Sequence, residues 1–289
     1  MRFIKVSDLK FPKRKINSHK GDNGKVLVVG GSQDYVGAVA LAGLAVLRTG
    51  ADLVTVIAPE KVAWAINCLT PDLITKKVKG DYFKLNHSNK VKTLFQNFDV
   101  ILIGNGLGLK RETMMFVQEI VKTPNYKVID ADGIKAITTK ITNTIITPHN
   151  RELEIFLINS GQKELVDKIK NRNIKKKALL IKKYLNKFLQ DNIILLKGRI
   201  DIIISDKDIL YNKTGNPGMT KAGTGDVLAG LCAGFLAQLK NLKQAAINAA
   251  YINGIIGDLL LKEKKGYSYI ASDIVKDIKH IIKRLKTKS

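Results

Sequence analysis

The chain has 289 residues, of which 45% are hydrophobic and 26% are charged. This composition is typical of a globular protein with a sizeable core and excludes an intrinsically disordered chain. Lys and Arg number 49 against 25 Asp and Glu, which gives a formal net charge of +24 at pH 7. No apolar run approaches the roughly 20 residues of a membrane helix, and the first residues lack the apolar core of a signal peptide. We therefore expect a soluble protein with no membrane partner.

Two cysteines, Cys68 and Cys232, lie far apart in apolar stretches. This usage excludes a disulfide framework and a Cys-x-x-Cys metal or redox site. It fits a reducing compartment, so we expect a cytoplasmic protein.

Much of the excess positive charge lies in residues 163–187, where basic residues are interleaved with leucines and isoleucines. A basic surface attracts polyanions such as nucleic acids, anionic membranes or phosphate-rich small molecules. The spacing favours an amphipathic helix or helix pair with a solvated basic face. Tyr184 is the one aromatic residue of the stretch, whereas surfaces that bind single strands interleave aromatic and basic residues. We therefore expect no nucleic-acid partner.

Strands and helices alternate along the first half of the chain. Residues 25–31 form a short β-branched run that ends in glycines, and an Ala/Leu-rich helical segment follows over 37–50. The same order recurs downstream. The predicted elements there are strands at 52–58, 99–103 and 127–130, a helix that begins at Glu112 and a helix near 133–137. This alternation predicts βα units and a mostly parallel sheet.

The second half of the chain continues the pattern and adds a hairpin. In chain order it predicts a strand at 144–148, a helical stretch over 152–190, strands at 192–198 and 201–205, and helices at 227–239, 242–261 and 272–285. The paired strands flank Gly198 and Arg199, which predicts a β-hairpin. Ser272 is the N-cap candidate of the last helix. Since no linker or internal repeat interrupts the chain, we expect one α/β domain over residues 1–289.

A glycine-rich loop over residues 212–225 leads directly into the helix that starts near Asp226. Small residues let backbone N–H groups converge there, and the helix N-terminus adds a partial positive charge. Together these features predict an anion hole for a phosphoryl group in transfer. Asp226 falls in the first turn, where a carboxylate can take a proton from a substrate hydroxyl. The alternative is that Asp226 merely caps the helix; the density of glycine before it favours the catalytic role.

Other phosphate, dinucleotide and metal motifs are missing from the sequence. No G-x-x-x-x-G-K-[ST] follows a strand, and residues 104–108 read G-x-G-x-G, which is not the dinucleotide fingerprint. The four histidines show no ligand spacing, which argues against a zinc site. His149, with Glu152 near it, lies at the carboxyl end of a predicted strand, where parallel sheets bind ligands. Structural and functional roles for His149 are equally open.

Several different short motifs lie along the chain in a fixed order. They are residues 19–25, 30–32, 35–38, 48–56, 71–72, 104–108, 130–133, 147–149, 196–198, 215–219 and 223–226. Taken together, over about residues 19–273, they resemble the ADP/ATP-dependent NAD(P)H-hydrate dehydratases of the ribokinase-like superfamily. The G-T-G-D motif alone would indicate only the superfamily.

The resemblance implies a ribokinase-like α/β fold, with a central mostly parallel sheet flanked by helices on both faces. It implies a repair lyase that converts the S form of hydrated NADH or NADPH (NADHX or NADPHX) to NADH or NADPH. ADP or ATP would phosphorylate the C6 hydroxyl, and loss of phosphate would restore the ring double bond. Mg²⁺ is expected with the nucleotide phosphates. Phosphate leaves far more readily than water, which explains why the hydroxyl is phosphorylated first. The glycine-rich loop fits this chemistry because it can neutralise charge during the transfer.

The resemblance also assigns residues to the reaction. Asp226 would be the catalytic base, and Gly223, Thr224 and Gly225 would form the anion hole. The donor nucleotide would lie against Lys197, Gly198, Arg199, Ile200, Asp201 and Gly225. The hydrated dinucleotide would lie near Ala38, Ala40, Gly106, Gly108, His149 and Asp226. The chain's metal ligands are left unassigned.

Three positions depart from the family's pattern. Asn105 stands where the family commonly has Pro, and Ala222 stands where it has Gly. Both residues are small or turn-compatible, so we expect little loss. Arg199 and Asp201 lie where the family commonly has Ala and Thr, which leaves the choice between ADP and ATP open. The preference between NADHX and NADPHX is open as well.

Many family members carry an N-terminal epimerase domain, whereas the first motif here starts at His19. We expect no such domain in this chain and a separate epimerase that acts on the same metabolite. Family members often form symmetric homo-oligomers. We expect a homo-oligomer here too, with the Ala/Gly-rich helix over 37–50 available to pack against a second copy.

Two alternatives remain open. A ribokinase-like kinase for a vitamin precursor or sugar would use the same base and anion hole, and a stable phosphorylated product would distinguish it. A nucleic-acid-binding protein is motivated only by the net charge. It would show a mobility shift with a steep salt dependence.

Overall fold

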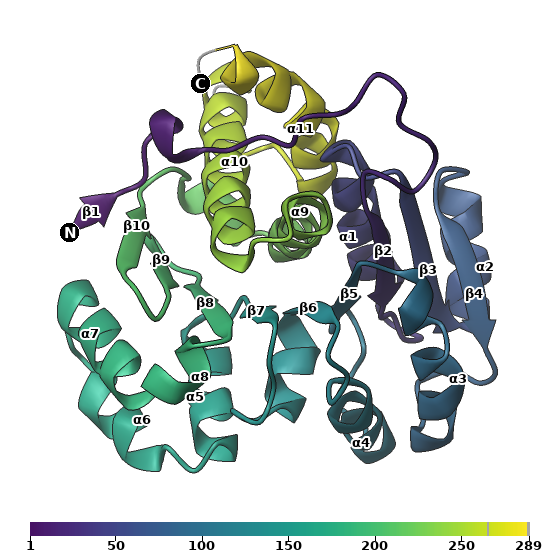
Figure 1. The fold of residues 1–289 in the computed structure, drawn as a ribbon, viewed down its shortest axis with the longest axis horizontal. Coiled ribbons are helices and arrows are strands. Elements are labelled where there is room, and N and C mark those ends of the chain that lie inside the picture. The colour runs from purple at the N-terminus through teal and green to yellow at the C-terminus, as the bar shows by residue number, and fades with distance from the viewer. Residues whose placement is uncertain (265, 288–289) are drawn as a thin grey trace.

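The computed structural model describes residues 1–264 and 266–287 (Figure 1). Within these residues ten strands form one sheet in the order β1-β10-β9-β8-β7-β6-β5-β2-β3-β4. The strands are β1 (Arg2–Phe3), β2 (Lys25–Val29), β3 (Leu53–Pro59), β4 (Ile74–Val78), β5 (Val100–Ile103), β6 (Tyr126–Ile129), β7 (Thr144–Ile146), β8 (Asn192–Leu196), β9 (Asp201–Ile204) and β10 (Ile209–Asn212). Strand β9 is antiparallel to β8 and β10, and the other neighbouring pairs run parallel. The sheet is mostly parallel, as the sequence predicts.

Helices cover both faces of the sheet (Figure 1). One face carries α1 (Val36–Arg48), α2 (Glu60–Leu69), α9 (Thr224–Leu239), α10 (Leu242–Glu263) and α11 (Ala271–Lys286). The other carries α3 (Ser88–Lys92), α4 (Arg111–Ile120), α5 (Asn150–Asn159), α6 (Lys163–Ile169), α7 (Ile174–Tyr184) and α8 (Asn186–Leu189). Short 3-10 helices are η1 (Val6–Asp8), η2 (Leu85–His87), η3 (Phe95–Asn97), η4 (Ala131–Ala136) and η5 (Pro217–Thr220). The predicted α/β architecture with two helical layers is confirmed.

The alternating side chains of each central strand enter two separate cores. In β2, Val26 and Val28 pack under α1 and α9, whereas Leu27 and Val29 pack on the opposite face. A strand buried on both faces reads as a continuous apolar run, which is how β2, β5 and β8 appear in the sequence. The polar groups of the loops are therefore left for the two edges of the sheet where the strands end.

Helices α1 and α9 approach closely because α9 carries glycines on the contact face. A Cβ atom at Gly230 would overlap the carbonyl oxygen of Ala42, and one at Gly234 would overlap the hydroxyl of Thr49. The small-residue face of α1, which we expected to meet a second copy, is thus covered by α9 within the chain. This contact also fixes the N-terminus of α9 at the carboxyl edge of the sheet.

Three predicted helices differ from those in the structure. The stretch over 152–190 is divided into α5, α6, α7 and α8, because the chain turns at Gly161 and Asn171, whose φ angles are +74° and +57°. The predicted helix near 133–137 is the 3-10 helix η4. Helix α11 begins at Ala271, with Ile270 at the N-cap in place of Ser272, because the Asp273 carboxylate accepts the Ile270 N–H.

The basic stretch forms the predicted amphipathic helix pair. Its members α6 and α7 bury Leu165, Ile169, Ala178 and Ile181 and leave most of their lysines exposed. The predicted hairpin is also confirmed, since β8 and β9 pair antiparallel. The sequence analysis predicts none of strands β1, β4 and β10 or helices α2 and α3. No helix in the described part of the chain combines the length and apolarity that crossing a membrane requires.

We predict that Gly230→Ala lowers the free energy of unfolding by about 1–3 kcal/mol, because the added methyl group forces α1 and α9 apart. Gly37, in α1, has open space around its Cβ position. The control Gly37→Ala should therefore raise that free energy by about 0.5 kcal/mol, since Ala is the better helix former. Urea unfolding of both variants measures the difference. A Gly230→Ala protein as stable as wild type would contradict the close-packing interpretation.

Candidate active site

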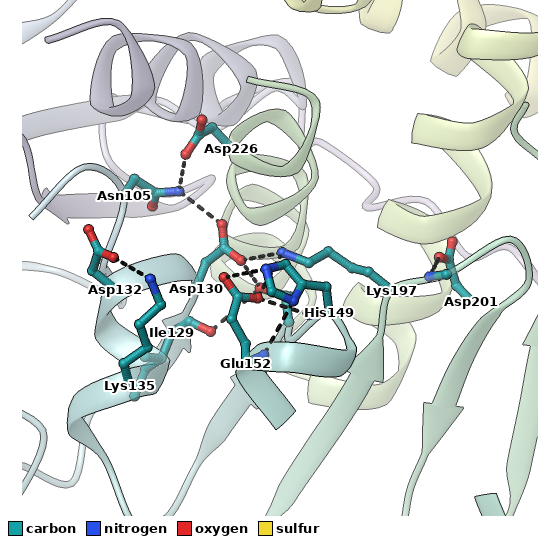
Figure 2. Close-up of polar contacts among 12 residues, drawn as sticks. Asn105, Ile129, Asp130, Asp132, Lys135, His149, Glu152, Lys197, Asp201 and Asp226 are labelled. Carbon is teal, nitrogen blue, oxygen red and sulfur yellow. Dashed lines mark hydrogen bonds and ion pairs between the residues drawn. The ribbon is translucent and has the colours of Figure 1, made fainter. Parts of the chain in front are cut away.

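The carboxyl ends of β5, β6, β7 and β8 meet the N-terminus of α9 at one edge of the sheet (Figure 2). Each strand is followed within two residues by a polar side chain that enters this region. The four side chains are Asn105, Asp130, Thr147 and Lys197. Neighbouring parallel strands end side by side, so residues that are far apart in the sequence come into contact here.

Asp130 is the centre of this group. Its Oδ1 atom accepts hydrogen bonds from Lys197 Nζ at 2.8 Å and from Thr147 Oγ1 at 2.7 Å. Its Oδ2 atom accepts the Asn105 amide at 3.1 Å. Only 2% of the Asp130 side chain is exposed, compared with 19% for Lys197. A buried carboxylate requires such partners, because its desolvation is otherwise uncompensated.

Asp226 joins the same network from the first turn of α9. Its Oδ1 atom accepts the Asn105 Nδ2–H at 2.7 Å (Figure 2). Burial, reinforced by the charge of Asp130, raises the pKa of Asp226 from 3.8 to about 6, although Asn105 and Lys197 oppose this rise. A carboxylate with a pKa just below neutrality is mostly ionised at pH 7 and binds a proton readily. Such a group is suited to general-base chemistry.

Lys197 brings positive charge to the carboxylates. Burial by itself lowers the pKa of its ammonium, but the charges of Asp130 and Glu152 outweigh burial, so the pKa is raised. Its Nζ lies 3.6 Å from Glu152 Oε2 and 3.6 Å from the position that a Cβ atom of Gly225 would occupy. The ammonium thus reaches the first turn of α9 and stays charged there.

His149 is the N-cap of α5. Its Nδ1 atom accepts the Glu152 N–H at 3.2 Å, and the Glu152 carboxylate accepts the His149 N–H at 2.9 Å. This reciprocal pair is a capping box, which stabilises the start of the helix. About half of the His149 side chain is exposed. The structure therefore shows a structural role for His149, and its exposed ring also faces the region beside Lys197 (Figure 2).

The N-terminus of α9, which carries Asp226, is half-buried. Gly223 occupies the N-cap with a φ of +91°, and a Cβ atom there would lie 2.8 Å from both Ala271 and Leu41. The Thr224 hydroxyl donates to the carbonyl groups of Met219 and Lys221, which holds the preceding loop in place. The backbone N–H groups of a first helical turn have no partners inside the helix. The Thr224 N–H donates to the Lys221 carbonyl outside the helix, at 3.4 Å. Asp226 contacts Asn105 instead of capping α9.

A family model described as NAD(P)H-hydrate dehydratase matches residues 26–280. The chain belongs to this family. The resemblance found in the sequence is confirmed, and the chain is a member of an enzyme family.

Individual relatives agree with this family assignment. A bifunctional NAD(P)H-hydrate repair enzyme, Nnr, from Methanocaldococcus jannaschii is 42% identical over 276 residues, which cover 94% of this chain and 50% of the relative. The chain therefore spans about half the length of the curated relatives it matches. An ADP/ATP-dependent NAD(P)H-hydrate dehydratase from Bacillus subtilis, co-crystallized with ATP and Mg²⁺, superposes with a TM-score of 0.82 at 26% identity over 98% of both chains. Ribokinase from Thermotoga maritima shares the fold, with a TM-score of 0.58 at 14% identity over 88% of this chain and 99% of its own.

Of the residues expected along the donor nucleotide, Gly225 lies in α9, and residues 197–201 lie at the turn between β8 and β9. The Gly198 N–H donates to Asp201 Oδ1 at 3.1 Å, and Asn212 donates to Asp201 Oδ2 at 3.1 Å. Burial raises the pKa of Asp201 to about 6 despite these two bonds. Arg199 is exposed on the turn, and Ile200 is half-buried. Lys197 points the other way, toward Asp130, so the structure divides this segment into two parts (Figure 2).

The residues expected near the hydrated dinucleotide are divided as well. Ala38 lies against the loop after β5, since a Cβ atom at Gly106 would lie 3.4 Å from the Ala38 Cβ. The Gly108 N–H in the same loop donates to Asp132 Oδ2 at 2.9 Å. Ala40, in contrast, lies on the buried face of α1, within the core. The structure therefore brings Ala38, Gly106 and Gly108 to the carboxyl edge and places Ala40 behind it.

Four residues of the network were missing from the predicted site. They are Asn105, Asp130, Thr147 and Glu152. Asn105 lies two residues beyond the predicted strand 99–103, whereas Asp130 and Thr147 fall at the carboxyl ends of the predicted strands 127–130 and 144–148. A polar residue at the carboxyl end of a strand is the signal that points to all three. The sequence predicts only a turn-compatible role for Asn105, whereas its amide links two carboxylates.

We predict that Asp226→Asn stabilises the protein at neutral pH. A carboxyl group whose folded pKa is raised contributes stability below its unfolded pKa, and that contribution is lost as pH rises through the folded pKa. With a rise from 3.8 to about 6, the Asn variant should gain about 1–3 kcal/mol in free energy of unfolding at pH 7. The gain should vanish below about pH 4.

Urea unfolding at several pH values measures this gain. The exposed Asp167 of α6 provides the control, since Asp167→Asn should change stability little at any pH. A gain for Asp226→Asn that is the same at every pH would contradict the assignment to ionisation.

Proposed function

We propose that the chain dehydrates the S form of hydrated NADH or NADPH to NADH or NADPH, driven by phosphoryl transfer from ADP or ATP. The observation that carries this proposal is the Asp226 carboxylate at the N-terminus of α9, within a network that keeps Lys197 charged beside it. It supports the proposal that Asp226 acts as a base next to an anion-binding helix end. The family match supplies the substrate class.

In the proposed reaction Asp226 takes the proton of the C6 hydroxyl as the hydroxyl oxygen attacks the terminal phosphorus of the nucleotide. The bond from that phosphorus to the nucleotide breaks, and AMP leaves from ADP, or ADP from ATP. The N–H groups at Gly223, Thr224 and Gly225 and the Lys197 ammonium stabilise the negative charge of the phosphoryl group in flight. Lys197 to Asp201 and Gly225 bind the donor.

The phosphorylated intermediate then loses phosphate and one ring proton, which restores the ring double bond. The dinucleotide lies along Ala38, Gly106 and Gly108, with the exposed ring of His149 at its side. Ala40 supports this wall from the core, since its side chain is buried behind it.

Magnesium would enter with the nucleotide. No group of three His, Cys, Asp or Glu side chains suited to hold a metal exists within residues 1–264 and 266–287. Asp130 and Asp132 are each already paired with a lysine, Lys197 and Lys135. The site therefore fits a Mg²⁺ held by phosphate oxygens and water, which is its usual environment in nucleotide enzymes. When bound, the ion neutralises phosphate charge.

We further propose that the described residues act as one dehydratase domain, in a cytoplasmic homo-oligomer that uses no nucleic acid. Cys68 and Cys232 carry free thiols, which suits a reducing compartment. The relatives of twice the length are named bifunctional repair enzymes. An epimerase that converts the other hydrate into the S form would be the partner activity.

The purified protein should regenerate NADH from hydrated NADH when Mg²⁺ and one of the two donors, ADP or ATP, are present. NADH absorbance and released phosphate should rise together, and AMP or ADP should appear according to the donor. A stable phosphorylated product in place of NADH would support a small-molecule kinase instead. No turnover with either donor in a folded, nucleotide-binding sample would contradict the proposed function.

We predict that Asp226→Asn nearly abolishes this turnover, by about a hundredfold or more, while nucleotide binding stays measurable. In the wild type kcat should fall as the pH drops below about 6, because the base must be ionised. Steady-state kinetics against pH, with nucleotide binding by calorimetry, provide the measurements. An active Asp226→Asn enzyme would exclude Asp226 as the base.

A further inference from the structure

The Asn105 amide joins two carboxylates. Its Nδ2 atom lies 2.7 Å from Asp226 Oδ1 and 3.1 Å from Asp130 Oδ2 (Figure 2). An amide nitrogen carries two protons, so each carboxylate receives one of them. The reversed amide would turn its oxygen toward two carboxylates, which repel it. The two carboxylates therefore fix the orientation of the Asn105 amide.

The backbone of Asn105 is held as firmly as its side chain. Its carbonyl oxygen accepts the Gly31 N–H at 2.8 Å, which ties the loop after β5 to the end of β2. The residue is fully buried, so water does not compete for the amide. The next residue, Gly106, has a φ of +66°, and a Cβ atom there would lie 2.7 Å from Tyr35 Cβ. The amide thus enters the site from a rigid support.

Without this donor, two carboxylates would face one another across a buried space. Like charges at short range favour protonation of one of them, which would remove the base. Lys197 contacts Asp130 directly, but no hydrogen bond or ion pair between Lys197 and Asp226 is present among the described residues. Asn105 is the group that contacts both acids.

We propose that Asn105 is a positioning residue, which fixes the Asp226 carboxylate relative to Asp130 and keeps it ionised for proton abstraction. This inference rests on the proposed function of Asp226 as the base. Asn105 acts through Asp226 and needs no contact with the reacting atoms. Its effect should therefore appear in the pH dependence of the rate more than in donor binding.

The other charged groups around Asp226 come from three elements. Asp130 follows β6, Asp132 lies in η4, and Lys197 follows β8. The two aspartates raise the pKa of Asp226 by their charge, and Lys197 lowers it. Lys135 pairs with Asp132 at 2.8 Å and moderates its charge. A variant of Asn105 leaves all these groups in place, so a change in the pH profile reports on the amide.

The test compares Asn105→Leu, which matches the size of Asn but lacks a donor, with Asn105→Asp, which is nearly isosteric. Dehydration rates are measured from pH 5 to 9, and the donor's KM is recorded at each pH. The control is Asn248→Leu. Asn248 is also fully buried, but its amide bonds the backbone of Lys10, on the N-terminal segment.

For Asn105→Leu the acid limb of the kcat–pH profile, where kcat falls as the pH is lowered, should move to higher pH by about one to two pH units. At pH 6 kcat should fall about tenfold, while most activity returns near pH 9 and the KM stays within about twofold. Asn105→Asp should shift the limb further, since it adds a third carboxylate. Asn248→Leu should lower the melting temperature without moving the limb.

A folded Asn105→Leu enzyme whose acid limb coincides with that of wild type overturns the proposal. If Asn105→Leu does not fold, Asn105→Asp decides by the same criterion. A second readout needs no turnover: ¹³C NMR titration of labelled Asp carboxyl groups, with the Asp226 signal assigned from Asp226→Asn. The Asp226 carboxyl should titrate at higher pH in Asn105→Leu than in wild type.

This titration separates the two proposals. If the wild type dehydrates neither hydrated NADH nor hydrated NADPH with ADP or ATP, the proposed function fails. The Asp226 titration alone then decides the role of Asn105. If the wild type is active and the titration is unchanged in Asn105→Leu, only the role of Asn105 fails.

Discussion

The ion pair between Lys197 and Asp130 is the interaction on which the site depends. It joins the ends of β6 and β8 across β7, and only 2% of the Asp130 side chain is exposed. A charge so deeply buried is strongly destabilising without its partners. Lys197, Thr147 and Asn105 supply them from three other loops. The loops that carry the site are therefore bound to one another before any ligand arrives.

Asp226 shows how this arrangement trades stability for reactivity. Its carboxylate is costly to bury next to Asp130, which is why its pKa rises to about 6. The same raised pKa makes it a better acceptor for a proton near neutrality. Asn105 and Lys197 limit the rise, so the group is still mostly ionised at pH 7. Burial with the charge of Asp130 and the opposing contacts of Asn105 and Lys197 together set the pKa of Asp226 at a value that suits its proposed task as a base. The cost is a lower stability of the fold.

Much of the positive charge of the chain lies away from the network around Asp130. Helices α6 and α7 carry much of it on an exposed face, over a row of buried apolar residues. Within the network, by contrast, Lys197 is bonded to Asp130 and lies near Glu152. The overall charge would attract polyanionic nucleotides at long range. The proposed chemistry at the helix end rests on Lys197 and the backbone, which are fixed by packing.

The sequence by itself determined the alternation of strands and helices, the glycine-rich start of α9 with Asp226 in its first turn, and the motifs of the dehydratase family. These are local properties, carried by periodicity and by the conformational needs of neighbouring residues. Only the tertiary structure decided that Asn105, Asp130 and Lys197 meet, because strand order brings residues of distant loops together and no local pattern encodes it. For the same reason the edge strands β1 and β4, and the strand β10 next to β1, were not predicted. Two residues or a lysine-rich run become a strand only when a neighbouring strand offers its hydrogen bonds.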